Sequence, residues 1–142
     1  MNGKRNGNGK EYNYDDGKLK FEGIYLNGKK WNGEGYNIMG NMEYEIRFGI
    51  GYIKEYNYDG VLIFEGEYIY GEKNGEGKEY NINGKLEFEG VYLNGKKWKG
   101  KEYNIYGKLE YVGEYLNGKR WNGIGKEYNN NGKLEFEGEY LN

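Results

Sequence analysis

Nearly the same nine residues occur three times along this chain. The sequence YLNGKRWNG spans Tyr115 to Gly123, while YLNGKKWNG and YLNGKKWKG begin at Tyr25 and Tyr92. A glycine that opens each repeated unit recurs every 20 to 25 residues, at Gly17, Gly40, Gly60, Gly84, Gly107 and Gly132. A period of this length is typical of stacked supersecondary units, in which each unit packs on its neighbours.

Each unit reads as two short strands separated by turns. In LEFEGEY, which ends at Tyr140, Leu134, Phe136 and Gly138 alternate with glutamates, so apolar groups and charges face opposite sides of a strand. Asn-Gly pairs such as Asn117-Gly118 favour hairpin turns in which both central residues have positive φ. The sequence therefore predicts an all-β fold, an elongated single-sheet array of stacked antiparallel β-hairpins with a period of about 23 residues.

The composition favours the same fold class. The 142 residues include 27 Gly and 18 Tyr but no Pro, Cys, His, Ser, Thr, Ala or Gln. Strong helix formers are therefore scarce, and the aromatic and β-branched residues suit a pleated, half-buried surface. We expect a core stripe of Leu, Phe, Tyr and Trp, with Phe88 and Phe136 as members, lying over glycines such as Gly125 and Gly138.

The repeat divides the chain into one array that spans residues 1–142. It consists of a half unit at 2–16, units at 17–39, 40–59, 60–83, 84–106 and 107–131, and a half unit at 132–142. The 40–59 unit is degenerate, because it lacks YLNGKKW and reads YEIRFGIGY. We interpret its apolar residues as a strand without a hairpin tip, which forms either a contact patch or a decayed repeat: Tyr44, Ile46, Phe48, Ile50 and Tyr52.

The order of these motifs resembles the membrane occupation and recognition nexus (MORN) repeat. The resemblance rests on an aromatic-Glu-Gly segment such as FEGVY at Phe88 to Tyr92, on Asn-Gly-Lys, and on Gly-x-Gly as at Gly123 to Gly125. It covers almost the whole chain, although the Trp after the basic pair departs from the familiar pattern. The resemblance implies a hairpin array without catalysis of its own, which serves as a scaffold or protein-contact surface or, in proposals for some members, binds anionic phospholipid.

No catalytic or metal-binding motif emerges from the residues. Ser, Cys, Thr and His nucleophiles are absent, and the repeated carboxylate pairs such as Glu135 and Glu137 fit a solvated strand face. The Gly-x-Gly segments lack a P-loop lysine and hydroxyl, and Asp15-Asp16-Gly17 lacks the ligands of a calcium loop. We therefore expect no enzyme activity, no cofactor and no metal, and the net charge of −2 gives no reason to expect a nucleic-acid partner.

Two surfaces remain as candidates for binding. The basic-aromatic hairpin tips suit an anionic membrane surface, or else form solvated turns whose Trp caps the core: Lys29, Lys30, Trp31, Lys96, Lys97, Trp98, Lys119, Arg120 and Trp121. The chain also begins and stops inside a unit, so the half units at its ends are either part of a longer array or pair head to tail between copies.

The leading hypothesis is a non-enzymatic scaffold that contacts itself or another protein, and anionic phospholipid binding is the alternative. With neither a signal peptide nor an apolar spanning segment in the sequence, the expected location is cytoplasmic.

Overall fold

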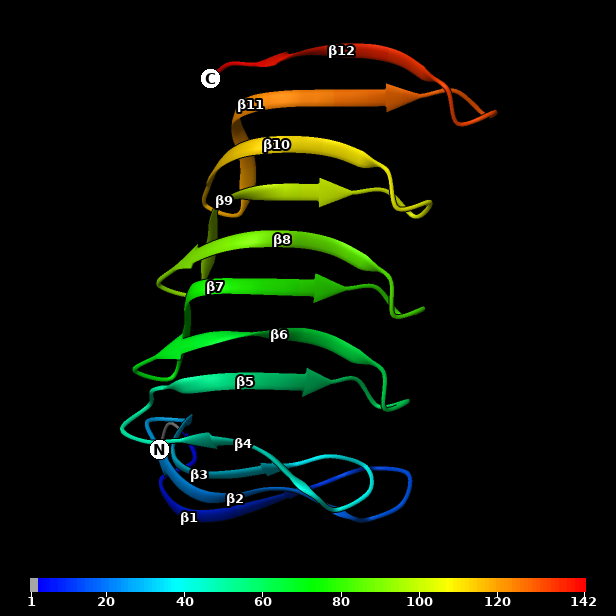
Figure 1. The fold of residues 1–142 in the computed structure, drawn as a ribbon. Coiled ribbons are helices and arrows are strands. Elements are labelled where there is room, and N and C mark those ends of the chain that lie inside the picture. The colour runs from blue at the N-terminus through cyan, green and yellow to red at the C-terminus, as the bar shows by residue number, and fades with distance from the viewer. Residues whose placement is uncertain (1–2) are drawn as a thin grey trace.

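The computed structural model describes residues 3–142 as twelve β-strands, with no helix in this range (Figure 1). The strands are β1 (Gly7–Tyr12), β2 (Leu19–Leu26), β3 (Lys29–Tyr36), β4 (Met42–Ile46), β5 (Gly51–Tyr56), β6 (Leu62–Ile69), β7 (Glu72–Tyr80), β8 (Leu86–Leu93), β9 (Lys96–Tyr103), β10 (Leu109–Leu116), β11 (Lys119–Tyr128) and β12 (Leu134–Tyr140). Strands that are neighbours in sequence pair antiparallel at every junction except that between β4 and β5, which confirms the predicted all-β hairpin array.

The array is interrupted once. Strands β1 to β4 form a four-stranded sheet and β5 to β12 an eight-stranded one, and only an isolated bridge from Arg47 to Ile50 joins β4 to β5. The interruption falls in the 40–59 unit, which at 20 residues is the shortest of the full units and contains the short strands β4 and β5, of five and six residues. The sheets still share a core, because Ile53 of β5 belongs to the buried cluster that contains Phe21 and Tyr25 of β2.

The hairpin tips are two-residue turns. Asn27, Asn94 and Asn117 have φ of 50–52° and each precedes a glycine with positive φ, as the Asn-Gly motif predicts. Phe48 and Tyr70 adopt the same backbone conformation before Gly49 and Gly71, although bulky residues rarely do so.

The interpretation of Tyr44 to Tyr52 as a strand without a hairpin tip is therefore wrong. Apolar residues do occupy every second position from Tyr44 to Tyr52, but the turn at Phe48-Gly49 interrupts this alternation. Backbone hydrogen bonds hold this turn in line with its neighbours, since Gly49 N–H donates to the Trp31 carbonyl and Gly71 N–H donates to the Gly49 carbonyl.

At the opposite ends of the strands, five of the six loops are organised by an asparagine that the sequence analysis did not identify, and in the β1–β2 loop Asp16 Oδ1 accepts a hydrogen bond from Lys18 N–H instead. In the loop that starts at Asn104, the side-chain Oδ1 accepts hydrogen bonds from the backbone N–H of Tyr106 and Lys108, both at 3.0 Å. The same pair of bonds recurs in four other loops, which start at Asn37, Asn57, Asn81 and Asn129. An Asx-type cap thus replaces a simple Asn-Gly or Asp-Gly turn.

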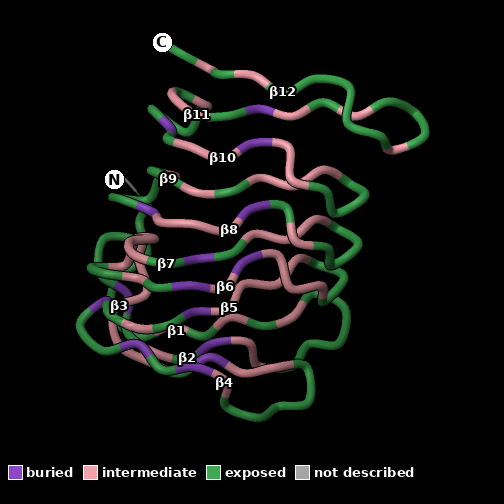
Figure 2. The backbone as a smooth tube through the Cα atoms, turned by 45° about the horizontal axis from the view of Figure 1, so that its top comes forward, coloured by how far each residue is buried: buried purple, intermediate pink, exposed green. Residues whose placement is uncertain are grey.

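The core is a column of aromatic rings that runs along the sheets, visible as buried segments in the middle of successive strands (Figure 2). In the eight-stranded sheet the rings meet edge to face, with centroids 5.3–5.6 Å apart, in the order Phe64, Tyr92, Phe88, Tyr115, Tyr111, Tyr140. This geometry adds to the free energy gained from burying the rings.

Part of the expected core lies elsewhere. Phe88 is fully buried, whereas Phe136, at the same position on β12, is 52% exposed because no described strand pairs with the outer edge of β12. Leu93, Leu116, Trp98 and Trp121 are exposed and do not belong to the ring column.

We expect Phe88→Ala to lower the free energy of unfolding by about 3–5 kcal/mol, because it removes a fully buried ring. Phe136→Ala should cost about 1 kcal/mol or less, since that ring is half exposed. Chemical denaturation of both variants compares the two positions directly, and equal losses would contradict the end effect.

Candidate functional site

The second basic residue of each hairpin tip folds back onto the aromatic core. Lys97 Nζ lies 2.9 Å from a carboxylate oxygen of Glu79 and 4.4 Å from the centroid of the Phe88 ring. Arg120 pairs with Glu102 and Glu110, each at 3.0 Å, and its guanidinium carbon lies 5.1 Å from the Tyr111 centroid. These cations neutralise carboxylates and cover rings, so they are less available to an external anion than the sequence predicted.

Lys30 occupies the same position in the N-terminal sheet. Its Nζ lies 3.1 Å from Glu11 and 4.4 Å from the centroid of the Phe21 ring. Lys30, Lys97 and Arg120 therefore make one structural contact that repeats along the array, with Lys73 also lying over Phe64. The prediction that both basic residues of a tip face an external surface is wrong for this second position.

Tyrosine hydroxyls complete two of these carboxylate sites. Tyr92 donates to Glu79 at 2.6 Å and Tyr115 donates to Glu102 at 2.8 Å. Burial alone would raise the pKa of Glu102, but hydrogen bonds from Arg120 and Tyr115 and the Arg120 charge outweigh it, so that this pKa lies below its usual 4.5. Burial and the bond to Glu102 raise the pKa of Tyr115, which stays neutral as a donor.

The first lysine and the tryptophan of each tip lie nearer the surface. Lys29 forms an ion pair with Glu72, and Trp31 stacks on Tyr70 with ring centroids 6.4 Å apart. Lys96 Nζ lies 3.5 Å from Asn117 Oδ1. Lys119 occupies the same position in its repeat as Lys96. Trp98 and Trp121 are 45% and 36% exposed.

Leucines lie beside these exposed tip residues. Leu26, Leu93 and Leu116 precede the Asn-Gly turns and are all exposed, as is Leu141 beyond β12. We call these leucines, together with Trp98 and Trp121, the tip row. It is more apolar and carries fewer free cations than the sequence predicted.

The predicted contact patch does not form one surface. Tyr44 and Ile46 are buried in the core shared by the two sheets, because they point to the same side as Phe21 and Tyr25. Phe48 lies in the turn and Ile50 and Tyr52 follow it, and all three side chains are exposed. Only these three residues remain available for a contact.

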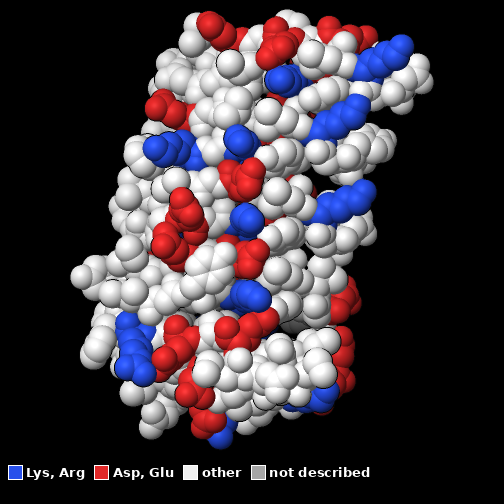
Figure 3. Space-filling model, viewed as in Figure 1, with Lys and Arg blue, Asp and Glu red and all other residues white. Residues whose placement is uncertain are grey.

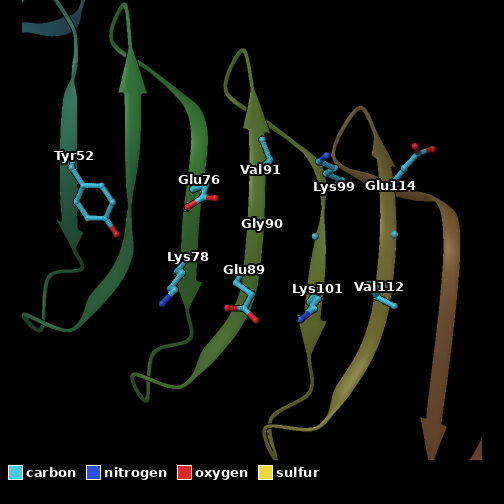
Figure 4. Close-up of a pocket in the computed structure, with 13 residues that line it drawn as sticks. Tyr52, Glu76, Lys78, Glu89, Gly90, Val91, Lys99, Lys101, Val112 and Glu114 are labelled. Atoms are coloured by element: carbon cyan, nitrogen blue, oxygen red, sulfur yellow. The ribbon is translucent and has the colours of Figure 1, made fainter.

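A groove of about 780 Å³ crosses the eight-stranded sheet (Figure 4). The sequence did not predict this groove. Its floor contains Gly77, Gly90, Gly100 and Gly113, which are cross-strand partners of one another in that order. Val91 and Val112 flank the glycines, and Tyr52 lies at one end. The row follows from the Gly in every unit, but its alignment depends on the register between strands.

Both signs of charge border this groove. Lys78, Lys99 and Lys101 lie among Glu76, Glu89 and Glu114. The molecular face in Figure 3 likewise intersperses acidic and basic side chains. This alternation offers no concentrated field for a ligand of one charge, and within residues 3–142 no cluster of acidic side chains has the arrangement of a metal site.

The outer strands leave two open sheet edges. β1 pairs only with β2, and β12 pairs only with β11. The ends of the array lie far apart (Figure 1). Next to β12, Phe136 is half exposed and Glu127 and Glu135 are exposed, and neither glutamate forms an ion pair within the described chain.

Comparison with protein-family models and with curated proteins finds no match for this chain. The resemblance to the MORN repeat therefore stays a prediction from the residues. The part of the chain that the structure describes contains no helix long and apolar enough to cross a membrane.

Proposed function

We propose that this protein is a non-enzymatic scaffold that joins protein partners by adding a strand to the open edge of its β-hairpin array. The observation that carries the proposal is the unfinished ring column at β12. Phe64, Phe88 and Tyr111 are 0–1% exposed, whereas Phe136 in the same position is 52% exposed. An added strand would bury this ring and pair the free edge.

The interior of the array indicates what such a strand would need. The strand after β10 places Gly125 opposite Tyr111, and its Arg120 covers the ring of Tyr111 and pairs with two carboxylates. At the corresponding positions β12 offers Phe136 and Glu135, and the adjacent β11 offers Glu127. A suitable partner is thus an extended segment with a glycine opposite the ring and a basic residue near the hairpin-tip end.

The chain itself supplies a probe for this proposal. A labelled peptide with residues 118–129, GKRWNGIGKEYN, contains β11 and should bind β12 as an added strand. We expect saturable binding by fluorescence anisotropy, and Phe136→Glu should reduce it at least tenfold because the charge occupies the apolar contact.

A peptide of scrambled order is the matched control, and near-UV circular dichroism reports whether the Phe136→Glu variant is folded. Equal binding of the native and scrambled peptides, or unchanged binding to a folded Phe136→Glu variant, would remove strand addition as the function.

The tip row supports a second candidate function, binding to an anionic phospholipid surface. Trp98 and Trp121 are exposed beside Leu93 and Leu116, and Lys96 and Lys119 follow the turns. Aromatic and basic side chains together suit the interface of an acidic bilayer. The inward folding of Lys97 and Arg120 onto carboxylates ranks this candidate below strand addition.

If the tip row binds lipid, the protein should co-sediment with acidic vesicles more than with neutral ones. Replacing both Trp98 and Trp121 by Ala should reduce that binding several-fold, because the interfacial rings are lost. Tyr14→Ala with Tyr106→Ala is the control, since both tyrosines are exposed in the loops at the opposite ends of the strands. Equal sedimentation with both kinds of vesicle would exclude binding to anionic phospholipid as the function.

A further inference from the structure

β1 repeats the pairing of β11 residue by residue. Gly7 faces Tyr25 and Gly9 faces Gly23, as Gly123 faces Tyr140 and Gly125 faces Gly138. One further match involves side chains: the Asn6 side chain accepts a hydrogen bond from Asn27 N–H, as the Asn122 side chain does from Asn142 N–H. β1 therefore has the place of a return strand like β11, and within residues 3–142 its other edge is unpaired.

This correspondence assigns Arg5 to the position of Arg120. Both residues follow Gly-Lys and precede the Asn-Gly of their strands, although β1 lacks the intervening tryptophan. Arg120 is held by Glu102, Glu110 and the Tyr111 ring. Arg5 instead pairs with Glu11 of β1 and lies over the Tyr25 ring of β2, and its side chain is 66% exposed.

The groups that Arg5 lacks are present at the other end of the molecule. Glu127, Glu135 and Phe136 stand in the places of Glu102, Glu110 and Tyr111, one unit further along the repeat. All three side chains are exposed. The β12 end thus has the two carboxylates and the ring but no cation to pair with them. The β1 end has the cation, Arg5, but not these carboxylates and this ring.

We propose that β12 of one copy pairs antiparallel with β1 of a second copy, and that the partner's Arg5 completes the site formed by Glu127, Glu135 and Phe136. The register follows that of β10 and β11, in which Tyr111 faces Gly125 and Tyr115 faces Arg120. Phe136 then faces the partner's Gly9, and Tyr140 faces the partner's Arg5. This inference rests on the proposed strand addition and names its partner as a second copy of the chain.

The missing tryptophan is compatible with this register. Between β10 and β11, Trp121 and Asn122 lie opposite the single residue Glu114, which produces an irregularity in the ladder. Glu139 would face the partner's Asn6 alone, so the new ladder continues without that extra residue. Because β1 and β12 lie at opposite ends of the array, repeated pairing produces an open chain of copies.

A charge exchange tests this pairing. The first variant is Arg5→Glu and the second is Glu127→Lys with Glu135→Lys. Each alone should remain monomeric in sedimentation velocity at concentrations where the unchanged chain forms elongated oligomers, because like charges then meet at the junction. An equimolar mixture should recover the oligomers, since each junction between the two variants joins opposite charges.

Arg47→Glu is the matched control, because Arg47 is an exposed arginine near the middle of the chain that pairs with Glu45. It should associate like the unchanged chain. Failure of the mixture to recover association, or association of the single variants, would overturn the assigned register. An unchanged chain that stays monomeric over a hundredfold concentration range would overturn pairing between copies.

The peptide experiment separates this inference from the proposed function. A monomeric chain that still binds the peptide of residues 118–129 overturns the second copy as partner but leaves strand addition intact. A monomeric chain that binds no peptide overturns both. An associating chain whose variants follow the charge exchange supports both.

Discussion

The fold depends on the close approach of aromatic rings to paired glycines. In the eight-stranded sheet, Gly66, Gly77, Gly90, Gly100, Gly113 and Gly123 are successive cross-strand partners. A Cβ atom at Gly100 would lie 2.7 Å from the Phe88 ring and 2.5 Å from the Glu89 carbonyl oxygen, so no side chain fits there. Because a single sheet has no second layer to bury its rings, this missing side chain lets the backbone itself form part of the core.

The remaining polar contacts follow from that arrangement. A ring that packs against the glycines of its own sheet is covered by a basic side chain from the next strand, which also pairs with a carboxylate, as Lys97 does on Phe88 with Glu79. Each ring is therefore covered from the strand that follows its own. The same dependence explains why Phe136 is exposed at β12 and why a further strand is the natural complement of that end.

The sequence was sufficient to predict the hairpin array because its repeat, Asn-Gly turns and alternation all point to the same pattern. It also contained an unused signal for Lys30: across a two-residue turn at Asn27-Gly28, Leu26 pairs with Lys29 and Tyr25 must therefore pair with Lys30, on the ring side. Phe48-Gly49 could not be recognised as a turn from propensity, because its conformation depends on hydrogen bonds to neighbouring tips. The groove and the break between β4 and β5 depend on strand register and on sheet packing, which local patterns do not specify.

The most direct test of the role of the glycine row is the free energy of unfolding of Gly100→Ala, measured by chemical denaturation beside Gly3→Ala. A Cβ at Gly3 has no atom within 4 Å, so that variant controls for the change of residue type. We expect Gly100→Ala to lose about 2–3 kcal/mol of unfolding free energy or to fail to fold, because the ring and the backbone cannot both move aside. A Gly100→Ala protein within about 0.5 kcal/mol of the unchanged chain would contradict it.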